Sequence, residues 1–197
     1  PVRFIGNYSS GKMGIALAEE AYCRGAKVTL VLGPSEEPVP QGIELVRVQT
    51  ANEMFEQCSK RFPNAHIAIL SAAVADYAPA QVAKEKIKKS DETLTLELKK
   101  TPDILKYLGT VKKKGQFLAG FALETHNEKE NALKKLKQKN ADIIILNSLA
   151  DKGAGFGHNS NKITIFDNEG KEIAFELKSK KQVAKDILDT IISYTHA

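Results

Sequence analysis

The apolar residues of this chain follow two spacings, one typical of strands and one typical of helices, in segments that alternate along the sequence. Short β-branched runs such as KVTLVLG (27–33) and HIAILSAA (66–73) are typical of strands buried in a parallel sheet. Elsewhere apolar residues recur every three to four positions, as Met13, Leu17 and Ala21 do, which is the spacing of an amphipathic helix. The pattern predicts helices over 9–25, 50–62, 102–113, 126–141 and 179–194, strands over 27–33, 43–48, 66–73, 93–99, 116–122 and 142–147, and a hairpin of 162–167 with 171–177.

Capping and turn residues fit these boundaries. Ser9 or Ser10 is the expected N-cap of the first helix, and Gly25 its stop. Thr50 and Glu53 have the spacing of a capping box. The long irregular stretch is 74–93, which is predicted to be a loop with short elements.

Strands that alternate with helices predict a Rossmann-like, three-layer α/β fold. Its mainly parallel sheet has helices on both faces, and hairpins add antiparallel strands. The chain has 197 residues, 42% of them hydrophobic, with no repeat or linker, so we expect a single domain over 1–197. Because the first residue is Pro1 rather than Met, we expect the chain to be cut from a longer one.

Composition narrows the function classes. No stretch approaches the roughly 18 apolar residues of a membrane span and no signal peptide opens the chain, so a cytoplasmic enzyme without a membrane partner is expected. Cys23 and Cys58 form no disulfide framework, which favours a reducing compartment. The net charge is +5, but the lysine clusters are not interleaved with aromatic residues. We therefore expect no nucleic-acid partner, and a minority of lysines facing anionic small molecules.

Candidate chemistry lies after the predicted strands, because ligands of open α/β sheets bind at the carboxyl ends of strands. NYSSGKMG (7–14) places hydroxyls and backbone N–H groups at a helix start, which suits an anion, although an ordinary capped helix explains it too. SAAVADYAP (71–79) has small residues and Asp76, suited to a ribose hydroxyl or a metal, or else to a packed turn.

Two lysine-rich segments add to these. Lys84, Lys86 and Lys88 share one side of an extended chain, and Lys135 and Lys139 share one helix face. Each set of lysines either binds a phosphate or forms a solvated surface. His126 and His158 have no partners at ligand spacing, so no protein metal ligands are assigned.

Taken together, the segments resemble one family. VRFIGNYSSGKMGIALAEEAYCRGAKVTLVLGP, AAVADYAP, KIKK, TPDIL, GFALET and KLKQKNAD follow one another in the order found in phosphopantothenate–cysteine ligases. The resemblance runs from Pro1 to the hairpin near residue 170. It implies an additional N-terminal strand, which is missing here, and in many bacteria a flavoprotein decarboxylase domain fused upstream.

The resemblance also implies roles for individual residues. The catalytic residues are Lys86, which meets the triphosphate, Asn7, which binds the acyl nucleotidylate, and Arg3, which contacts the acyl intermediate or the partner subunit. Ser9, Ser10 and Gly11 are implied to bind a substrate anion. The implied nucleotide-binding residues are Lys86 again, with Leu70, Ser71, Ala72, Asp76, Pro102, Asp103, Ile104, Leu105, Phe121, Lys135 and Lys139.

The implied reaction joins cysteine to 4′-phosphopantothenate in coenzyme A biosynthesis. It consumes CTP, or alternatively ATP, with Mg²⁺ held chiefly by phosphate oxygens and waters. A homodimer with both subunits near the site is implied as well. Two other functions are compatible with the residues alone. One is an NAD(P)-dependent Rossmann oxidoreductase, although the chain has no GxGxxG string, and the other is a nonenzymatic nucleotide- or RNA-binding module.

Overall fold

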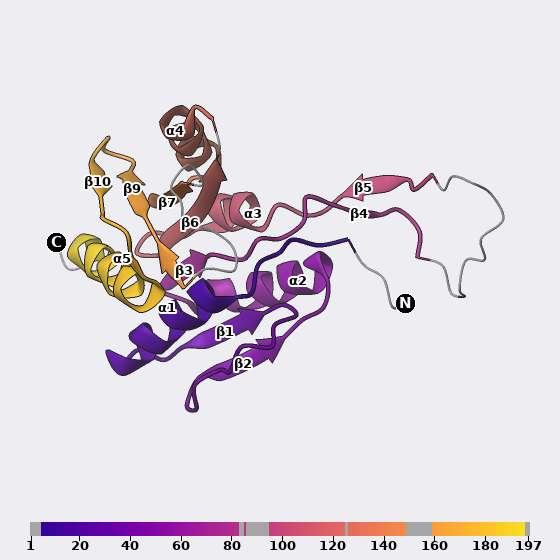
Figure 1. The fold of residues 1–197 in the computed structure, drawn as a ribbon, viewed down its shortest axis with the longest axis horizontal. Coiled ribbons are helices and arrows are strands. Elements are labelled where there is room, and N and C mark those ends of the chain that lie inside the picture. Colours follow the sequence, from indigo (N-terminus) through magenta and orange to yellow (C-terminus); the bar gives the residue numbers. More distant parts are fainter. Residues whose placement is uncertain (1–4, 83–84, 86–94, 125, 149–158, 196–197) are drawn as a thin grey trace.

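A five-stranded mixed sheet forms the centre of the computed structural model (Figure 1). The structure describes residues 5–82, 85, 95–124, 126–148 and 159–195. The strand order is β10–β9–β7–β6–β3, in which β3, β6 and β7 are parallel and β9 and β10 antiparallel. The strands span Ile67–Leu70 (β3), Phe117–Glu124 (β6), Ile143–Ser148 (β7), Ile163–Asp167 (β9) and Glu172–Ala174 (β10).

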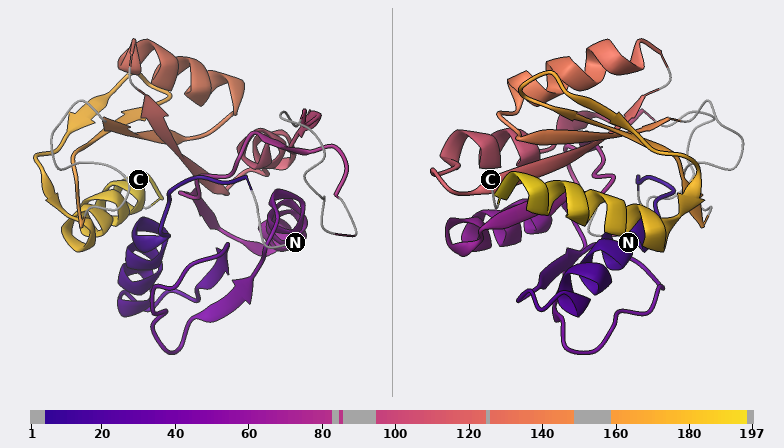
Figure 2. Two further views of the ribbon diagram at one scale, coloured as in Figure 1. Left: turned by 45° about the vertical axis from the view of Figure 1, so that its right-hand side comes forward. Right: turned by 90° about the vertical axis from the view of Figure 1, so that its left-hand side faces the viewer.

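Helices cover both faces of this sheet, as Figure 2 shows. The side chains of β7 alternate between the two faces, so both faces are apolar and need a cover. Ile143 and Ile145 point into one apolar cluster, and Ile144 and Leu146 point into a second one. The first cluster is closed by α1 (Lys12–Cys23) and α5 (Lys180–Thr195), and the second by α2 (Ala51–Arg61), α3 (Ile104–Val111) and α4 (Glu128–Gln138).

Three smaller strand pairs surround the central sheet. Parallel β1 (Thr29–Leu32) and β2 (Glu44–Arg47) form a sheet of their own. Antiparallel β4 (Tyr77–Pro79) and β5 (Leu98–Lys100) form the start of an arm that extends away from the body (Figure 1). The third pair is β8 (Ser160–Asn161) with β11 (Lys178–Ser179), and a 3₁₀ helix, η1, covers Phe62–Asn64.

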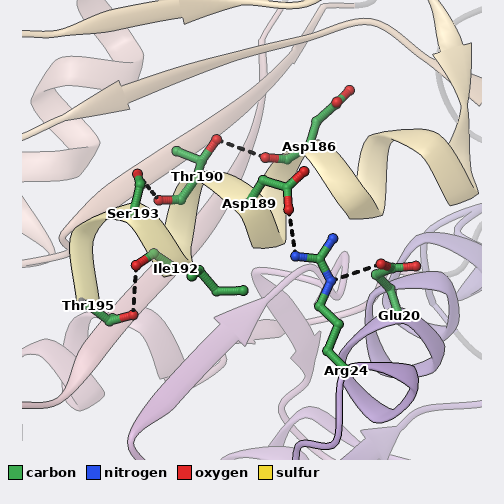
Figure 3. A network of polar contacts seen from close by, with 8 residues as sticks. All are labelled: Glu20, Arg24, Asp186, Asp189, Thr190, Ile192, Ser193 and Thr195. Carbon is green, nitrogen blue, oxygen red and sulfur yellow. Dashed lines mark hydrogen bonds and ion pairs between the residues drawn. The ribbon is translucent and has the colours of Figure 1, made fainter. Parts of the chain in front are cut away.

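An arginine ties the two helices of one face together (Figure 3). Arg24, just after α1, donates to Glu20 of its own helix at 2.9 Å and to Asp189 of α5 at 2.6 Å. Asp189 and, after it, Glu20 raise the pKa of the Arg24 guanidinium. The contact adds to the apolar packing that holds α1 against α5.

The predicted fold class is confirmed, and most element boundaries agree within a few residues. Thr50 Oγ1 accepts from the Glu53 N–H at 3.1 Å, as predicted for an N-cap. The N-cap predicted at Ser9 or Ser10 is wrong: it is Gly11, with φ +82°, and no side chain caps the helix. Glycine adopts positive φ at little cost, so the chain turns there and both serine hydroxyls are left out of capping.

The strand predicted over 93–99 is also different. Residues 95–97 are not strand, and β5 is exposed at all three of its positions. The alternating pattern TLTLELK indicates one buried face, but β5 lies on the arm rather than on the body. Among the described residues, no helix is both long and apolar enough to cross a membrane.

Candidate functional site

The carboxyl ends of the parallel strands bring the predicted segments to one edge of the sheet. The register pairs Leu70 at the end of β3 with Gly120 of β6, so the chain after β3 leaves the sheet beside Phe121. The segment before α1 and the segment before α3 reach the same edge, because both are hydrogen-bonded to the chain that follows β3. We call this edge the carboxyl rim.

The segment before α1 is fastened to the segment after β3. Asn7 Nδ2 donates to the carbonyl oxygen of Ala73 at 2.7 Å, across 66 residues of sequence. A Cβ on Gly14, in the first turn of α1, would lie 3.0 Å from Ser71 Oγ, so the helix start packs closely on this segment. Two of the four predicted segments, 7–14 and 71–79, are therefore side by side.

The turn at Ser10 and Gly11 is held from the other side by the end of β1. Ser35 Oγ donates to the Ser10 carbonyl at 2.7 Å and accepts from the Glu37 N–H at 3.2 Å. A Cβ on Gly11 would meet Leu32 at 3.2 Å and Ser35 at 3.3 Å. The backbone at residues 9–11 is thus fixed on both sides, while the hydroxyls of Ser9 and Ser10 do not cap α1.

A second connection joins the segment after β3 to the start of α3. Thr101 Oγ1 donates to the Ala75 carbonyl at 2.7 Å, and the Thr101 N–H donates to the Asp76 carbonyl at 2.9 Å. Pro102 and Asp103 follow immediately. Asp103 caps α3 by accepting the Lys106 N–H at 2.9 Å, so its carboxylate is held at the rim.

Two lysines reach the carboxyl rim, one from α4 and one from the residue that follows it. Lys139 forms an ion pair with Asp103, and Lys135 Nζ donates to the Phe121 carbonyl at 2.9 Å. Gly109 makes the first contact possible, since a Cβ there would lie 1.8 Å from the Lys139 carbonyl oxygen. The Asn140 amide also donates to the Gly109 carbonyl at 2.8 Å, which keeps the end of α4 against α3.

The ionisable groups of the rim influence one another. Burial lowers the pKa of Lys135, an effect that Glu124, Asp103 and Asp76 partly oppose. Burial acts to raise the pKa of Asp103, but hydrogen bonds from Lys139 and the Lys106 N–H outweigh it and the pKa is lowered. Asp103 is thus held as a carboxylate, and Lys135 is a cation that a nearby anion would stabilise.

The structure brings together most, but not all, of the residues predicted for the site. Arg3, Lys86, Lys84, Lys88 and His158 lie outside the described residues. Asp76 and Ala72 are exposed at the rim, whereas Ile104 and Leu105 are buried in the core under α3. The side chains of Ile104 and Leu105 therefore serve the core rather than contact a ligand.

Other polar features lie away from the predicted residues. A surface hollow of about 340 Å³ lies at the opposite end of β3 and β6, lined by residues 63–66 and 113–116, none of which was predicted to bind a ligand. Within the described ranges, no group of three or more His, Cys, Asp or Glu side chains is arranged to hold a metal.

Comparison with known proteins identifies the family. The family model described as "DNA/pantothenate metabolism flavoprotein C-terminal domain" matches residues 1–194. The chain belongs to this family. The resemblance drawn from the motifs is thereby confirmed.

Relatives and solved structures agree with that family. The chain is 46% identical over 192 residues to the coenzyme A biosynthesis bifunctional protein CoaBC of Bacillus subtilis (strain 168), covering 97% of this chain and 47% of that protein. It is 52% identical over 197 residues to a cysteine/cysteine sulfinic acid decarboxylase from an unknown prokaryotic organism, covering 100% of this chain and 55% of that protein. The chain therefore spans about half the length of the curated relatives it matches.

A crystal structure of the C-terminal domain of a CoaBC protein has the same fold. It superposes with a TM-score of 0.82 at 41% identity, covering 97% of this chain and 86% of that one. The similarity extends over the strands and helices that build the carboxyl rim. The rim is thus part of the architecture that this family shares.

Sequence reasoning missed several residues that build this family's rim here. Thr101 and Ser35 were not singled out, because one hydroxyl residue in a loop gives no periodic signal. Gly109 was missed because a glycine within a helical pattern does not reveal which backbone approaches it. Asn147, near the end of β7, has a buried Oδ1 with no hydrogen-bond partner among the described residues, which only coordinates can show.

Proposed function

We propose that the protein ligates cysteine to 4′-phosphopantothenate through an acyl nucleotidylate. The observation that carries the proposal is the bond from Asn7 to Ala73, since it joins the two most specific motifs into one surface. Family membership supports the same reaction class. The decarboxylase name of one relative describes a protein almost twice as long, and we do not extend it to this chain.

The reaction has two steps. The phosphopantothenate carboxylate attacks the α-phosphorus of the nucleoside triphosphate, forming an acyl phosphate bond and releasing pyrophosphate. The cysteine amine then attacks the acyl carbon, so that an amide forms, the nucleoside monophosphate leaves and a proton is lost. Negative charge develops on phosphoryl oxygens in the first step, and fixed cations at that place lower the barrier.

The rim offers groups that suit a magnesium-bound triphosphate. Lys135 and Lys139 come from one helix face, and Lys135 Nζ donates to a neutral backbone carbonyl, that of Phe121. The exposed carboxylate of Asp76 lies close enough to affect Lys135, and it can contact a ribose hydroxyl or a magnesium-bound water. Mg²⁺ enters as part of the nucleotide substrate, held mainly by phosphate oxygens.

Asn7 is proposed to act on the acyl nucleotidylate. Its amide is exposed and its Nδ2 is oriented by the Ala73 carbonyl, which leaves Oδ1 facing away from that bond. Lys86 and Arg3 keep the roles implied by the family: Lys86 contacts the triphosphate, and Arg3 the acyl intermediate. CTP is proposed as the preferred nucleotide, with ATP as the alternative, on the family resemblance.

A homodimer is also proposed, with the arm at the interface. Around β4 and β5 the large side chains of Tyr77, Val82, Leu96 and Leu98 are all exposed, and Val82 is 68% exposed. Such a group on a projecting arm is typical of a surface that packs on another molecule. Static light scattering tests this directly: twice the monomer mass is expected, and a monomer at micromolar concentration would contradict it.

Pyrophosphate release tests the proposed function. With phosphopantothenate, Mg²⁺ and CTP the wild-type protein should release pyrophosphate, and more slowly with ATP. Lys86→Gln should lose this activity, whereas the matched control Lys114→Gln, at the opposite end of the sheet, should keep it. No pyrophosphate from either nucleotide would overturn the proposal.

A ligand panel adds an independent check. A ligand that binds the folded state raises the melting temperature. CTP with Mg²⁺ should raise it, and phosphopantothenate should increase the shift further. Stabilisation by NADPH alone would favour an oxidoreductase instead.

A further inference from the structure

Thr101 joins two candidate nucleotide-binding segments, the loop after β3 and the start of α3. Its hydroxyl binds the Ala75 carbonyl and its N–H the Asp76 carbonyl. Two residues later, Asp103 caps α3 and pairs with Lys139. A continuous series of contacts therefore runs from the loop after β3, through Thr101, to the lysines of α4.

The two bonds of Thr101 differ in what they require. The register of β4 and β5 pairs Tyr77 with Lys100, so the bond from the Thr101 N–H to Asp76 continues that ladder. Any residue except proline can make it. The bond to Ala75 lies one residue beyond the ladder and needs a side-chain hydroxyl, which only serine or threonine supplies at this position.

The hydroxyl bond fixes where the loop leaves the arm. Without it, Ala75 and Asp76 would be held only by the ladder, and short, exposed ladder ends open readily. Asp76 is exposed and its charge acts on Lys135. The distance between these two groups thus depends on the geometry at Thr101, although Thr101 itself touches neither.

We propose that Thr101 is a positioning residue for nucleotide binding, which holds the 71–76 loop in register with the start of α3. The inference rests on the proposed function, because it takes these segments to bind the nucleotide. Thr101 contacts no atom of the 7–11 segment in any hydrogen bond described above. The 7–11 segment is joined to this loop upstream of Ala75, by the bond from Asn7 to Ala73, so the effect on phosphopantothenate should be much smaller than the effect on the nucleotide.

Thr101→Val tests this, because valine keeps the shape of threonine and removes the hydroxyl. Isothermal titration with CTP and Mg²⁺ should give a Kd about three- to tenfold higher than wild type, the size expected for one lost hydrogen bond. The Kd for phosphopantothenate should stay within about twofold. Thr101→Ser, the matched control, should restore the wild-type Kd for CTP.

Other outcomes decide against the proposal. An unchanged Kd for CTP in Thr101→Val would overturn it, and so would an equal weakening of both ligands together with a lower Tm, which indicates a general structural role. If Thr101→Val does not fold, Thr101→Ala carries the same comparison, since alanine also lacks the hydroxyl and adds no bulk.

The experiment separates this inference from the proposed function. A wild-type protein that binds CTP but forms no acyl nucleotidylate would refute the ligase, while the Thr101 comparison could still be read from the Kd. A wild-type protein that binds neither CTP nor ATP refutes both.

Discussion

Both ends of the central sheet carry a lysine–aspartate pair, but the two pairs are built differently. At the amino end, Asp142 accepts from Lys112 Nζ at 2.8 Å through one oxygen and from the Leu118 N–H at 2.6 Å through the other. Lys112 is only 13% exposed. Both carboxylate oxygens are used by the fold, and the lysine is largely buried.

At the carboxyl rim the corresponding groups are only partly satisfied. Asp103 also uses both oxygens, but its side chain is 46% exposed, and the second lysine beside it, Lys135, is bonded to a neutral carbonyl. A buried cation gains most when an anion arrives. The amino-end pair is therefore closed within the fold, whereas the half-buried Lys135 beside a more exposed carboxylate supports the phosphate site proposed at the carboxyl rim.

The largest expected effect is on catalysis at the carboxyl rim. Asn7→Asp should lower kcat by on the order of 100-fold, because a group that contacts the reacting centre is replaced by a negative charge. Acyl nucleotidylate should accumulate and be detectable in quenched reactions. Because aspartate cannot donate to the Ala73 carbonyl, the free energy of unfolding should also fall by about 1 kcal/mol, the size of one exposed hydrogen bond. Wild-type turnover in this variant would remove Asn7 from the site.

At the amino end, the same kind of change should affect stability instead. Asp142→Ala removes the acceptor of the Leu118 N–H and leaves the half-buried Lys112 unpaired. The free energy of unfolding should fall by about 1–3 kcal/mol, measured by urea denaturation. The Kd for CTP should not change. If Asp142→Ala instead raises the Kd for CTP and leaves the free energy of unfolding unchanged, the nucleotide binds at the amino end, which contradicts the proposal.

Removing the lysine of the carboxyl-rim pair should instead affect nucleotide binding more than stability. Lys139→Met should raise the Kd for CTP by roughly tenfold, since one charge-assisted contact is lost. The free energy of unfolding should change less than in Asp142→Ala, because the ion pair with Asp103 is more exposed. Lys137→Met is the matched control on the solvent side of α4, and it should leave the Kd unchanged.

The smallest expected effect is a proton linkage at Lys135. Burial lowers its pKa from the ordinary value of 10.5, so the unfolded chain binds more protons between the lowered pKa and 10.5. The contribution of Lys135 to stability therefore rises as pH rises through that window. A bound triphosphate should raise the pKa again, so CTP binding should take up a fraction of a proton at alkaline pH.

Calorimetry in two buffers with different ionisation enthalpies measures this proton uptake. The uptake should disappear in Lys135→Met, while Lys137→Met should retain it. Equal uptake in both variants would assign the linkage to another group.

How far the sequence predicts this molecule depends on the kind of interaction. Periodicity predicts β7, whose alternate residues enter two apolar clusters. The spacing of Thr50 and Glu53 predicts Thr50 as a helix cap. Both depend on neighbours in sequence. Family resemblance predicts Asn7 and Asp76 in one site, and the structure shows a bond from Asn7 to Ala73, three residues before Asp76.

What could not be predicted involves backbone atoms that meet across long distances in sequence. Thr101 binds a carbonyl 26 residues away, and Gly109 is required because the Lys139 carbonyl lies against it. Neither leaves a local pattern. The same reason explains the wrong N-cap: Ser9 and Ser10 have suitable side chains, but positive φ at Gly11 decides where α1 starts.

Hydrogen exchange with and without CTP and Mg²⁺ tests most directly which end of the sheet binds the nucleotide. Ligand binding slows amide exchange where it stabilises local structure. We predict protection in residues 7–14, 71–76 and 101–106 and in the lysine-bearing turn of α4, with no change in 63–66 and 113–116. Protection confined to the latter two segments, or protection nowhere, would contradict a nucleotide site at the carboxyl rim.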